Sequence, residues 1–217
     1  MAGFNYGRAP INQAAASSRQ YIVGLSQQIV AGDVVVLTGV GGVTRVRKLL
    51  AADITNNFTE SAVIKGILGI AAHDVATDAN GVLTVPATPS YIAGGTRIIL
   101  PLPSYAAGID VDPVSGNPRL SVFLADPFNE FLARVAGAAN AAVTVNSALL
   151  EAGVGIQIVN TTDVNLNTAA TGAGICAVIS GMDEQDINFN VSSAQGRVFV
   201  RFLPAYQQSN TNVLYVA

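Results

Sequence analysis

The sequence is poor in the residues that carry most enzyme chemistry. Its 217 residues include one cysteine, one histidine and no tryptophan, and only 12% of them are charged. Lone Cys176 excludes an intrachain disulfide, and lone His73 excludes a histidine-based metal site. No pattern in the sequence groups a nucleophile with a base, so we expect no enzyme and no bound cofactor.

Long hydrophobic runs are also missing. The most apolar stretch, residues 22–37, is interrupted by Gln27, Gln28 and Asp33, so no segment of about twenty apolar residues exists to cross a bilayer. The first residues lack the basic and apolar regions of a signal peptide, and we expect synthesis in the cytoplasm. No dense basic patch of the kind that binds nucleic acid occurs. We therefore expect neither a membrane nor a nucleic acid as a partner.

The scarcity of charge has a consequence for the surface. Hydrophobic residues make up 50% of the chain, whereas the charged fraction is about half the roughly 25% of an average soluble domain. We interpret this as a surface partly covered by other protein chains, as in obligate interfaces. The alternative is a solitary domain whose surface consists of Asn, Gln, Ser and Thr.

The charges are unevenly spread along the chain. Residues 1–65 contain six basic and three acidic residues, a net charge of +3, so the remainder carries −6 of the total of −3. This polarity would suit docking of the N-terminal third on an acidic protein surface. Scattered, solvated charges explain it equally well.

Residues 1–20 show no sustained hydrophobic period. They contain glycine, proline and a run of alanine and serine, with Phe4, Tyr6, Arg8 and Arg19 among them. Aromatic and arginine side chains are typical anchors at protein interfaces. We interpret the segment as an extended arm that binds a neighbouring subunit, with a frayed terminus as the alternative.

Residues 21–118 are expected to form a first β lobe. A β-branched run at 34–37, a glycine turn and an alternating stretch at 43–47 predict a hairpin. Residues 62–71 read as a buried strand in which Gly66 and Gly69 mark a bulge or a close backbone approach. Residues 78–81 predict a turn, and short strands are expected at 82–86 and 97–102.

Two strands flank the centre of the chain, within residues 119–135. Alternating apolar residues on both sides of Asp126-Pro127 predict strands, and the proline requires the chain to turn or cross over between them. We expect the first strand to complete the first lobe and the second to begin the next one.

Residues 119–217 are expected to form a second β lobe. Strands are predicted at 143–145, 156–159, 176–180, 187–191, 198–203 and 213–216, one helical turn at 147–152, and a long polar loop at 160–173. The overall expectation is an all-β chain of two small barrel-like or sandwich-like lobes with an extended N-terminal arm.

The remaining polar motifs are better explained by structure than by chemistry. His73 has no second ligand or orienting partner and is interpreted as a structural or surface histidine. The acidic groups at 110–112 and 183–186 lack the central glycine and distal glutamate of a calcium loop, so we interpret both as turns. Cys176 lies among aliphatic residues and is expected to be buried.

The order of motifs between residues 29 and 85 resembles that of the small β domains of head decoration, or cement, proteins of tailed bacteriophages. The resemblance consists of Ala31-Gly32-Asp33, an apolar strand, a glycine turn, an alternating strand, the stretch at 66–71 and a turn with Asn80-Gly81. The second half, with residues 123–134, 153–155 and 197–203, is similar to virion structural proteins that accompany phage heads. The alanine-rich residues 136–142 depart from that pattern.

The resemblance implies a structural virion protein on the exterior of a capsid. Its partner would be the major capsid protein, it would form homotrimers, and it would hold neighbouring capsomers together without turnover. The residues expected to bind the capsid or a neighbouring subunit are Phe4, Tyr6, Arg8, Arg19 and Tyr215. A tail or baseplate protein is one alternative. A carbohydrate-binding β-sandwich is another, although aromatic residues, which such sites need, make up only 6% of the chain.

Overall fold

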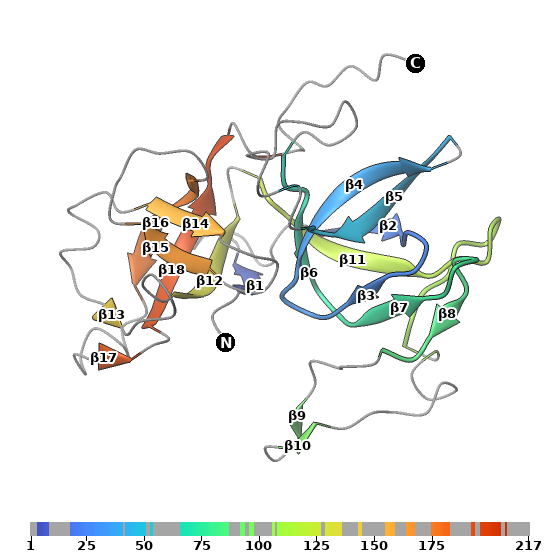
Figure 1. The fold of residues 1–217 in the computed structure, drawn as a ribbon, viewed down its shortest axis with the longest axis horizontal. Helices are drawn as coiled ribbons and strands as arrows, with labels where there is room; N and C mark the ends of the chain where they lie inside the picture. The colour runs from blue at the N-terminus through green and yellow to red at the C-terminus, as the bar shows by residue number, and fades with distance from the viewer. Residues whose placement is uncertain are drawn as a thin grey trace.

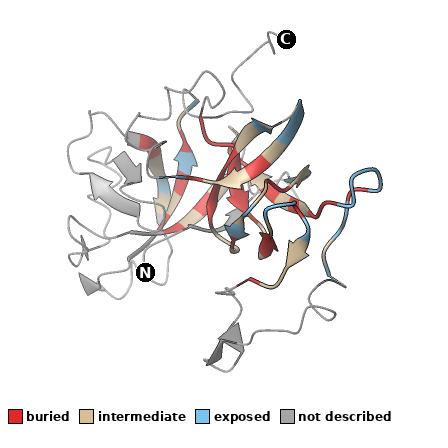
Figure 2. Ribbon diagram, turned by 45° about the vertical axis from the view of Figure 1, so that its right-hand side comes forward, coloured by how far each residue is buried: buried red, intermediate tan, exposed pale blue. Residues whose placement is uncertain are grey.

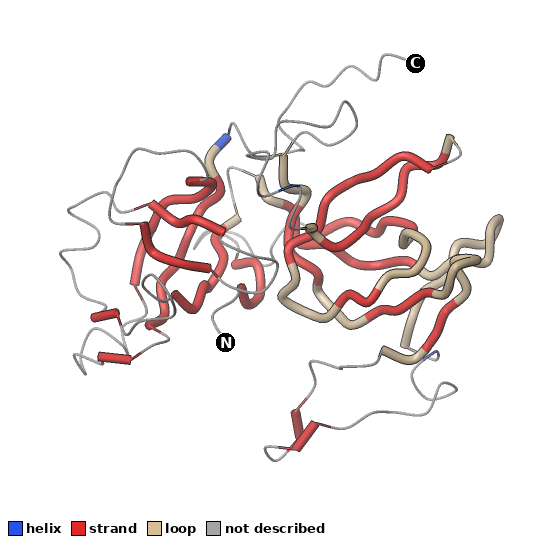
Figure 3. Tube along the Cα trace, viewed as in Figure 1, coloured by secondary structure: helices blue, strands red, loops and turns tan. Residues whose placement is uncertain are grey.

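The computed structural model is built almost entirely of antiparallel strands. The residues that it describes are 4–8, 18–40, 42–50, 53, 66–86, 92–93, 96–97, 106, 108–126, 129–135, 143–144, 155–158, 164–167, 175–182, 192–193, 196–204 and 207. Strands dominate this part of the chain, and very few of its residues are helical (Figure 3). The expected all-β class is therefore confirmed.

The first part of the chain forms a five-stranded sheet with the order β2-β11-β6-β4-β5, which lies on the right in Figure 1. Its strands are β2 (Ser18–Ile22), β4 (Val34–Val40), β5 (Val43–Lys48), β6 (Gly69–Ala71) and β11 (Arg119–Leu124). A smaller sheet, β3-β7-β8, consists of β3 (Gln28–Ile29), β7 (Val75–Thr77) and β8 (Leu83–Thr84). A separate pair is formed by β9 (Ile92–Ala93) and β10 (Thr96–Arg97).

The predicted hairpin is present as β4 and β5. Val40 pairs with Val43, so only residues 41 and 42 connect the strands, and Gly42 has a φ of +77°. Tight two-residue connections require positive φ values, which glycine adopts without steric cost. The β-branched valines on either side favour the extended backbone of the two strands.

The first part of strand β4, residues 34–36, is buried on both of its faces. Val34 and Val36 belong to one hydrophobic cluster, whereas Val35 belongs to another, with partly buried Leu37 packed against it. Successive side chains of a strand point to opposite faces, so one short apolar run serves two cores. This explains why the run at 34–37 is continuous rather than alternating.

Gly69 is the close backbone approach that the sequence indicated. It lies on β6, and a Cβ atom placed there would overlap the carbonyl oxygen of Phe123 on β11. Only a residue without a side chain allows these two strands to pair at this point. Of the predicted strand at 62–71, residues 62–65 lie outside the described residues.

Strands from residues 130–202, together with β1 near the start of the chain, form a six-stranded sheet with the order β1-β12-β18-β16-β14-β15. Its strands are β1 (Phe4–Arg8), β12 (Glu130–Val135), β14 (Gly155–Ile158), β15 (Val164–Asn167), β16 (Ile175–Met182) and β18 (Gly196–Phe202). A further pair is formed by β13 (Val143–Thr144) and β17 (Ser192–Ser193).

Strand β15 corrects one expectation. Residues 160–173 were expected to form a long loop because they are polar, but residues 164–167 pair with β14 as an edge strand. Val164 and Leu166 stand opposite Ile158 and Ile156 in the register. An edge strand needs only alternate apolar residues, so its two asparagines do not prevent pairing.

The predicted crossover occurs at Asp126. Strand β11 belongs to the five-stranded sheet and β12 to the six-stranded sheet. Asp126 Oδ1 accepts a hydrogen bond from the backbone N–H of Asn129 at 2.8 Å, and buried Asn129 donates from Nδ2 to the carbonyl of Leu124 at 2.8 Å. These bonds satisfy polar groups where the chain leaves one sheet for the other.

The two large sheets share a hydrophobic core. One cluster combines Val34, Val36, Leu49, Ile67 and Ile70 with Ala125, Phe131, Ala133, Cys176, Ala177, Val198, Val200 and Phe202. Phe131 and Phe202 meet edge to face, with ring centroids 5.4 Å apart. A second cluster covers the opposite face of the five-stranded sheet and includes Ile29 and Val75 of the small sheet. Figure 2 shows the buried residues along the central strands.

Several expectations fall on residues that the structure does not describe. They are the strand residues 98–102, the helical turn at 147–152, the acidic group at 183–186 and the strands at 187–191 and 213–216.

Candidate functional site

The structure does not bring the sequence-predicted binding residues together. Phe4, Tyr6 and Arg8 lie on β1, whose register pairs it with β12 of the same chain. Arg19 is exposed on β2, in the other large sheet, with Val122 as its register partner. Tyr215 lies outside the described residues. The candidate site that stands out is instead built from loops at the end of the five-stranded sheet.

The loop that precedes β11 is held by a set of short polar contacts. Asp112 Oδ1 pairs with Arg119 Nη2 at 2.7 Å, and Asp112 Oδ2 accepts from the backbone N–H and the hydroxyl of Ser115 at 2.8 and 2.7 Å. The backbone of Asp112 also bonds to Asn117 and to Gly116. The hydrogen bonds from Ser115 and Arg119 lower the pKa of Asp112 to about 2. The acidic group at 110–112 is therefore part of a turn, as its sequence indicated.

Asn117 joins this loop to strand β5 and to the turn at Gly81. With its amide oxygen facing the guanidinium, buried Asn117 accepts from Arg45 Nη1 and Nη2 at 3.0 and 3.1 Å, and its Nδ2 donates to the carbonyl of Gly81 at 3.2 Å. Arg45 belongs to β5, and Gly81 belongs to the predicted turn, where Asp78 Oδ1 accepts from the N–H groups of Asn80 and Val82. One side chain thus connects three chain segments that are distant in the sequence.

Four exposed valines lie close in the sequence to the residues of this junction. Val114 is 94% exposed, Val82 57%, Val111 47% and Val43 39%. Val82 follows Gly81, Val111 forms a bridge with Pro118 beside Asn117, and Val43 lies two residues before Arg45. We call these four residues the valine tip. Figure 2 shows exposed residues at the end of the β4–β5 hairpin and along the loop before β11.

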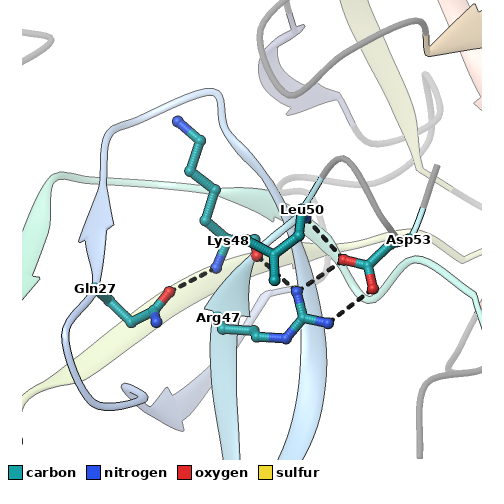
Figure 4. A network of polar contacts seen from close by, with 5 residues as sticks. All are labelled: Gln27, Arg47, Lys48, Leu50 and Asp53. Carbon is teal, nitrogen blue, oxygen red and sulfur yellow. Dashed lines mark hydrogen bonds and ion pairs between the residues drawn. The ribbon is translucent and has the colours of Figure 1, made fainter. Parts of the chain in front are cut away.

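A second polar network lies at the end of β5 in the same sheet (Figure 4). Arg47 binds Asp53 with two hydrogen bonds of 2.8 Å, and the Leu50 N–H donates to the same carboxylate at 2.8 Å. Gln27 Oε1 accepts from the Lys48 N–H at 3.0 Å. Burial opposes ionisation of Asp53, but the bonds from Arg47 and Leu50 outweigh it and hold the pKa of this carboxyl below its ordinary value.

Asp33 is a buried carboxylate with a different balance. Its Oδ1 pairs with Lys48 Nζ at 2.8 Å, and its Oδ2 accepts from the Val30 N–H at 2.9 Å. Burial nevertheless raises the pKa of Asp33 above its ordinary value, because the loss of water outweighs both contacts. Asp33, directly before β4, therefore stabilises the pairing of β4 and β5 through its contact with Lys48 of β5.

The two residues with the greatest catalytic potential have structural positions. His73 Nε2 accepts from the Ser121 N–H at 3.1 Å and its Nδ1 lies 3.1 Å from the Asp74 carbonyl, so a neutral ring with its proton on Nδ1 satisfies both contacts. Cys176 is fully buried in the shared core. The burial expected for Cys176 is confirmed. Among the residues that the structure describes, no three His, Cys, Asp or Glu side chains gather as metal ligands.

Comparisons with known proteins found no relatives. No family model matches the chain, and no curated protein or solved structure matches it either. Within the described part of the chain, no helix is long and apolar enough to span a membrane.

The sequence contained only a partial signal for the valine tip. Pro113, Gly116 and Pro118 indicated a turn, and Asp78 with Gly81 indicated another. Nothing local showed that these turns lie side by side, because Asn117 and Gly81, which join them, are 36 positions apart (117 − 81). A valine between two turn residues does not reveal whether it is covered.

Proposed function

We propose that this protein is a structural virion protein that binds the outer surface of a tailed-phage capsid and stabilises contacts between capsomers. In this proposal the valine tip seats on the major capsid protein, the protein acts as a homotrimer and no reaction is catalysed. The resemblance of residues 29–85 to head decoration proteins and the scarcity of charged residues support the assignment.

The single observation that carries the proposal is the exposure of Val114 on a braced loop. An apolar side chain that is 94% exposed gains free energy when a partner covers it, roughly 1.5–3 kcal/mol for complete burial. The Asp112, Ser115 and Arg119 contacts hold the loop before any partner arrives. Little conformational entropy is then lost on binding, which is how a preorganised surface gains affinity.

Cosedimentation of the purified protein with capsids that lack it tests this proposal. Val114→Ser should weaken binding about tenfold, since each tenfold change corresponds to about 1.4 kcal/mol, and Val82→Ser should add to the loss. Leu50→Ser is the matched control, because Leu50 is 51% exposed but lies outside the valine tip. Its binding should equal that of the wild type.

Two results would contradict the proposal. One is a wild-type protein that does not bind capsids at all, and the other is full binding by the double variant of Val82 and Val114. Imaging of labelled virions provides an independent readout, because label on the tail would favour the alternative of a tail or baseplate protein. Arg19, exposed on β2, remains a candidate for a second capsid contact.

A further inference from the structure

Strand β1 occupies an unusual place in the topology. It forms one edge of the six-stranded sheet, whose other strands all come from residues 130–202. The next strand, β2, belongs to the five-stranded sheet. Strand β1, which has five residues, is therefore separated by more than 120 positions of sequence from β12, the strand with which it pairs.

The sheet requires a strand at this position. Phe131 and Ala133 of β12 are fully buried in the core that the two sheets share, and β1 also lies against β6 and β11 of the other sheet. Without β1, one side of the β12 backbone would lose its hydrogen-bond partners. The structure does not require that the strand come from the same molecule.

The pairing of β1 is suited to exchange. The strand is short, and its register with β12 shifts between Phe4 and Gly7, so its ladder is interrupted. Short, terminal and interrupted strands open at a lower free-energy cost than central strands. The register places Arg8 opposite Glu130, and any copy of the chain can supply the same register, while the Glu130 carboxylate pairs with Arg201 of β18.

The chain between the strands is long enough to reach another molecule. Nine residues, 9–17, separate β1 from β2, and an extended segment of this length spans about 30 Å. Both the closed and the exchanged forms make the same β1–β12 ladder. Their equilibrium depends on linker entropy and concentration, which is why strand exchange is a low-cost route to oligomers.

We propose that β1 exchanges between copies of this chain, so that Phe4–Arg8 of one protomer pairs with β12 of its neighbour in the oligomer. The partner at this sheet edge is thus a second copy of the same protein. The proposal does not depend on capsid binding, because it concerns contacts between the protein's own subunits.

Cysteine pairs can test the exchange in a Cys176→Ala background. One tagged chain carries Arg8→Cys and a second chain carries Glu130→Cys, and the two are coexpressed and oxidised at high concentration. Residues directly opposite in an antiparallel pair lie close enough for a disulfide. Exchange should yield a covalent heterodimer on a non-reducing gel, and reduction should release it.

Two controls make the result decisive. Arg8→Cys paired with Ser180→Cys should give no heterodimer, since exposed Ser180 lies on β16, which β18 separates from β12. A single chain with both Arg8→Cys and Glu130→Cys reports whether the bond forms within a molecule. Only internal bonding, or bonding in neither arrangement, would overturn the proposal. Capsids take no part in this measurement, so its failure would leave capsid binding by the valine tip untouched.

Discussion

At the scale of single residues, three aspartates contribute to the free energy of unfolding with opposite dependences on pH. The pKa of Asp112 is lowered to about 2 and that of Asp53 is also lowered, so each contributes stability above the ordinary value of 3.8 that is lost as the pH falls through the folded-state pKa. The raised pKa of Asp33 works in the other direction. Its contribution is complete below pH 3.8 and is lost as the pH rises through its folded-state pKa.

We expect Asp112→Asn to lower the free energy of unfolding at pH 7, because it removes the ion pair with Arg119. The difference from the wild type should shrink as the pH falls from 3.8 towards about 2, where the wild-type carboxylate is itself protonated. Urea titrations at several pH values measure this difference. A gap between the two proteins that stays constant down to pH 2 would contradict the assignment, and comparison at each pH cancels the contribution of Asp33.

At the scale of the element, β4 differs from an ordinary surface strand because both faces of its first residues, 34–36, are covered. Val35 and Val36 are fully buried, but they belong to different hydrophobic clusters. In a strand with one exposed face, one of two adjacent residues points to solvent, and its side chain can be shortened with little loss of stability. Here neither position should tolerate it.

Val35→Ala and Val36→Ala are each expected to reduce the free energy of unfolding by roughly 2 kcal/mol, the order of magnitude for removing buried methyl groups together with the cavity left behind. Val43→Ala on the paired strand β5 is the control, because Val43 is 39% exposed and should change stability by less than about 0.5 kcal/mol. Chemical denaturation followed by circular dichroism gives all three values. Tolerance at either buried valine would show that one face of β4 is not packed as described.

At the scale of the whole molecule, the two sheets are coupled through a shared core. Phe131 on β12 and Phe202 on β18 pack in the same cluster as Val34 and Val36 of β4. The sequence indicated two lobes, and the structure contains two large sheets joined by the crossover at Asp126, with β1 from the start of the chain in the second sheet. Apolar residues from both meet between them, so the sheets should lose their structure together.

Phe131→Ala should therefore destabilise both sheets, by roughly 3–5 kcal/mol in total, which is typical of a buried phenylalanine. Hydrogen exchange resolves the effect, since amides of β4 and of β18 should lose protection by a similar factor. Leu83→Ala, at a partly buried position against the other cluster, provides a comparison with a smaller expected effect. Protection lost in β18 but kept in β4 would show that the sheets unfold independently.

The local patterns in the sequence determined those strands and turns whose backbone conformation depends on the stereochemistry of single residues. β-Branched valines account for the β4–β5 hairpin, and positive φ accounts for the turn ending at Gly81. The missing side chain of Gly69 allows the close approach, and the proline of Asp126-Pro127 accounts for the crossover. The strand at 164–167 was missed because polarity was taken to exclude pairing, whereas an edge strand needs apolar residues only at alternate positions.

Only the tertiary structure decided which segments meet. The pairing of β1 with β12, the shared core and the junction of Arg45, Gly81 and Asn117 all join residues far apart in the chain. Such contacts depend on how whole sheets pack, and no local period encodes them. Exposure is decided in the same way, because Val114 and Val36 are both valines but Val114 is 94% exposed and Val36 is fully buried.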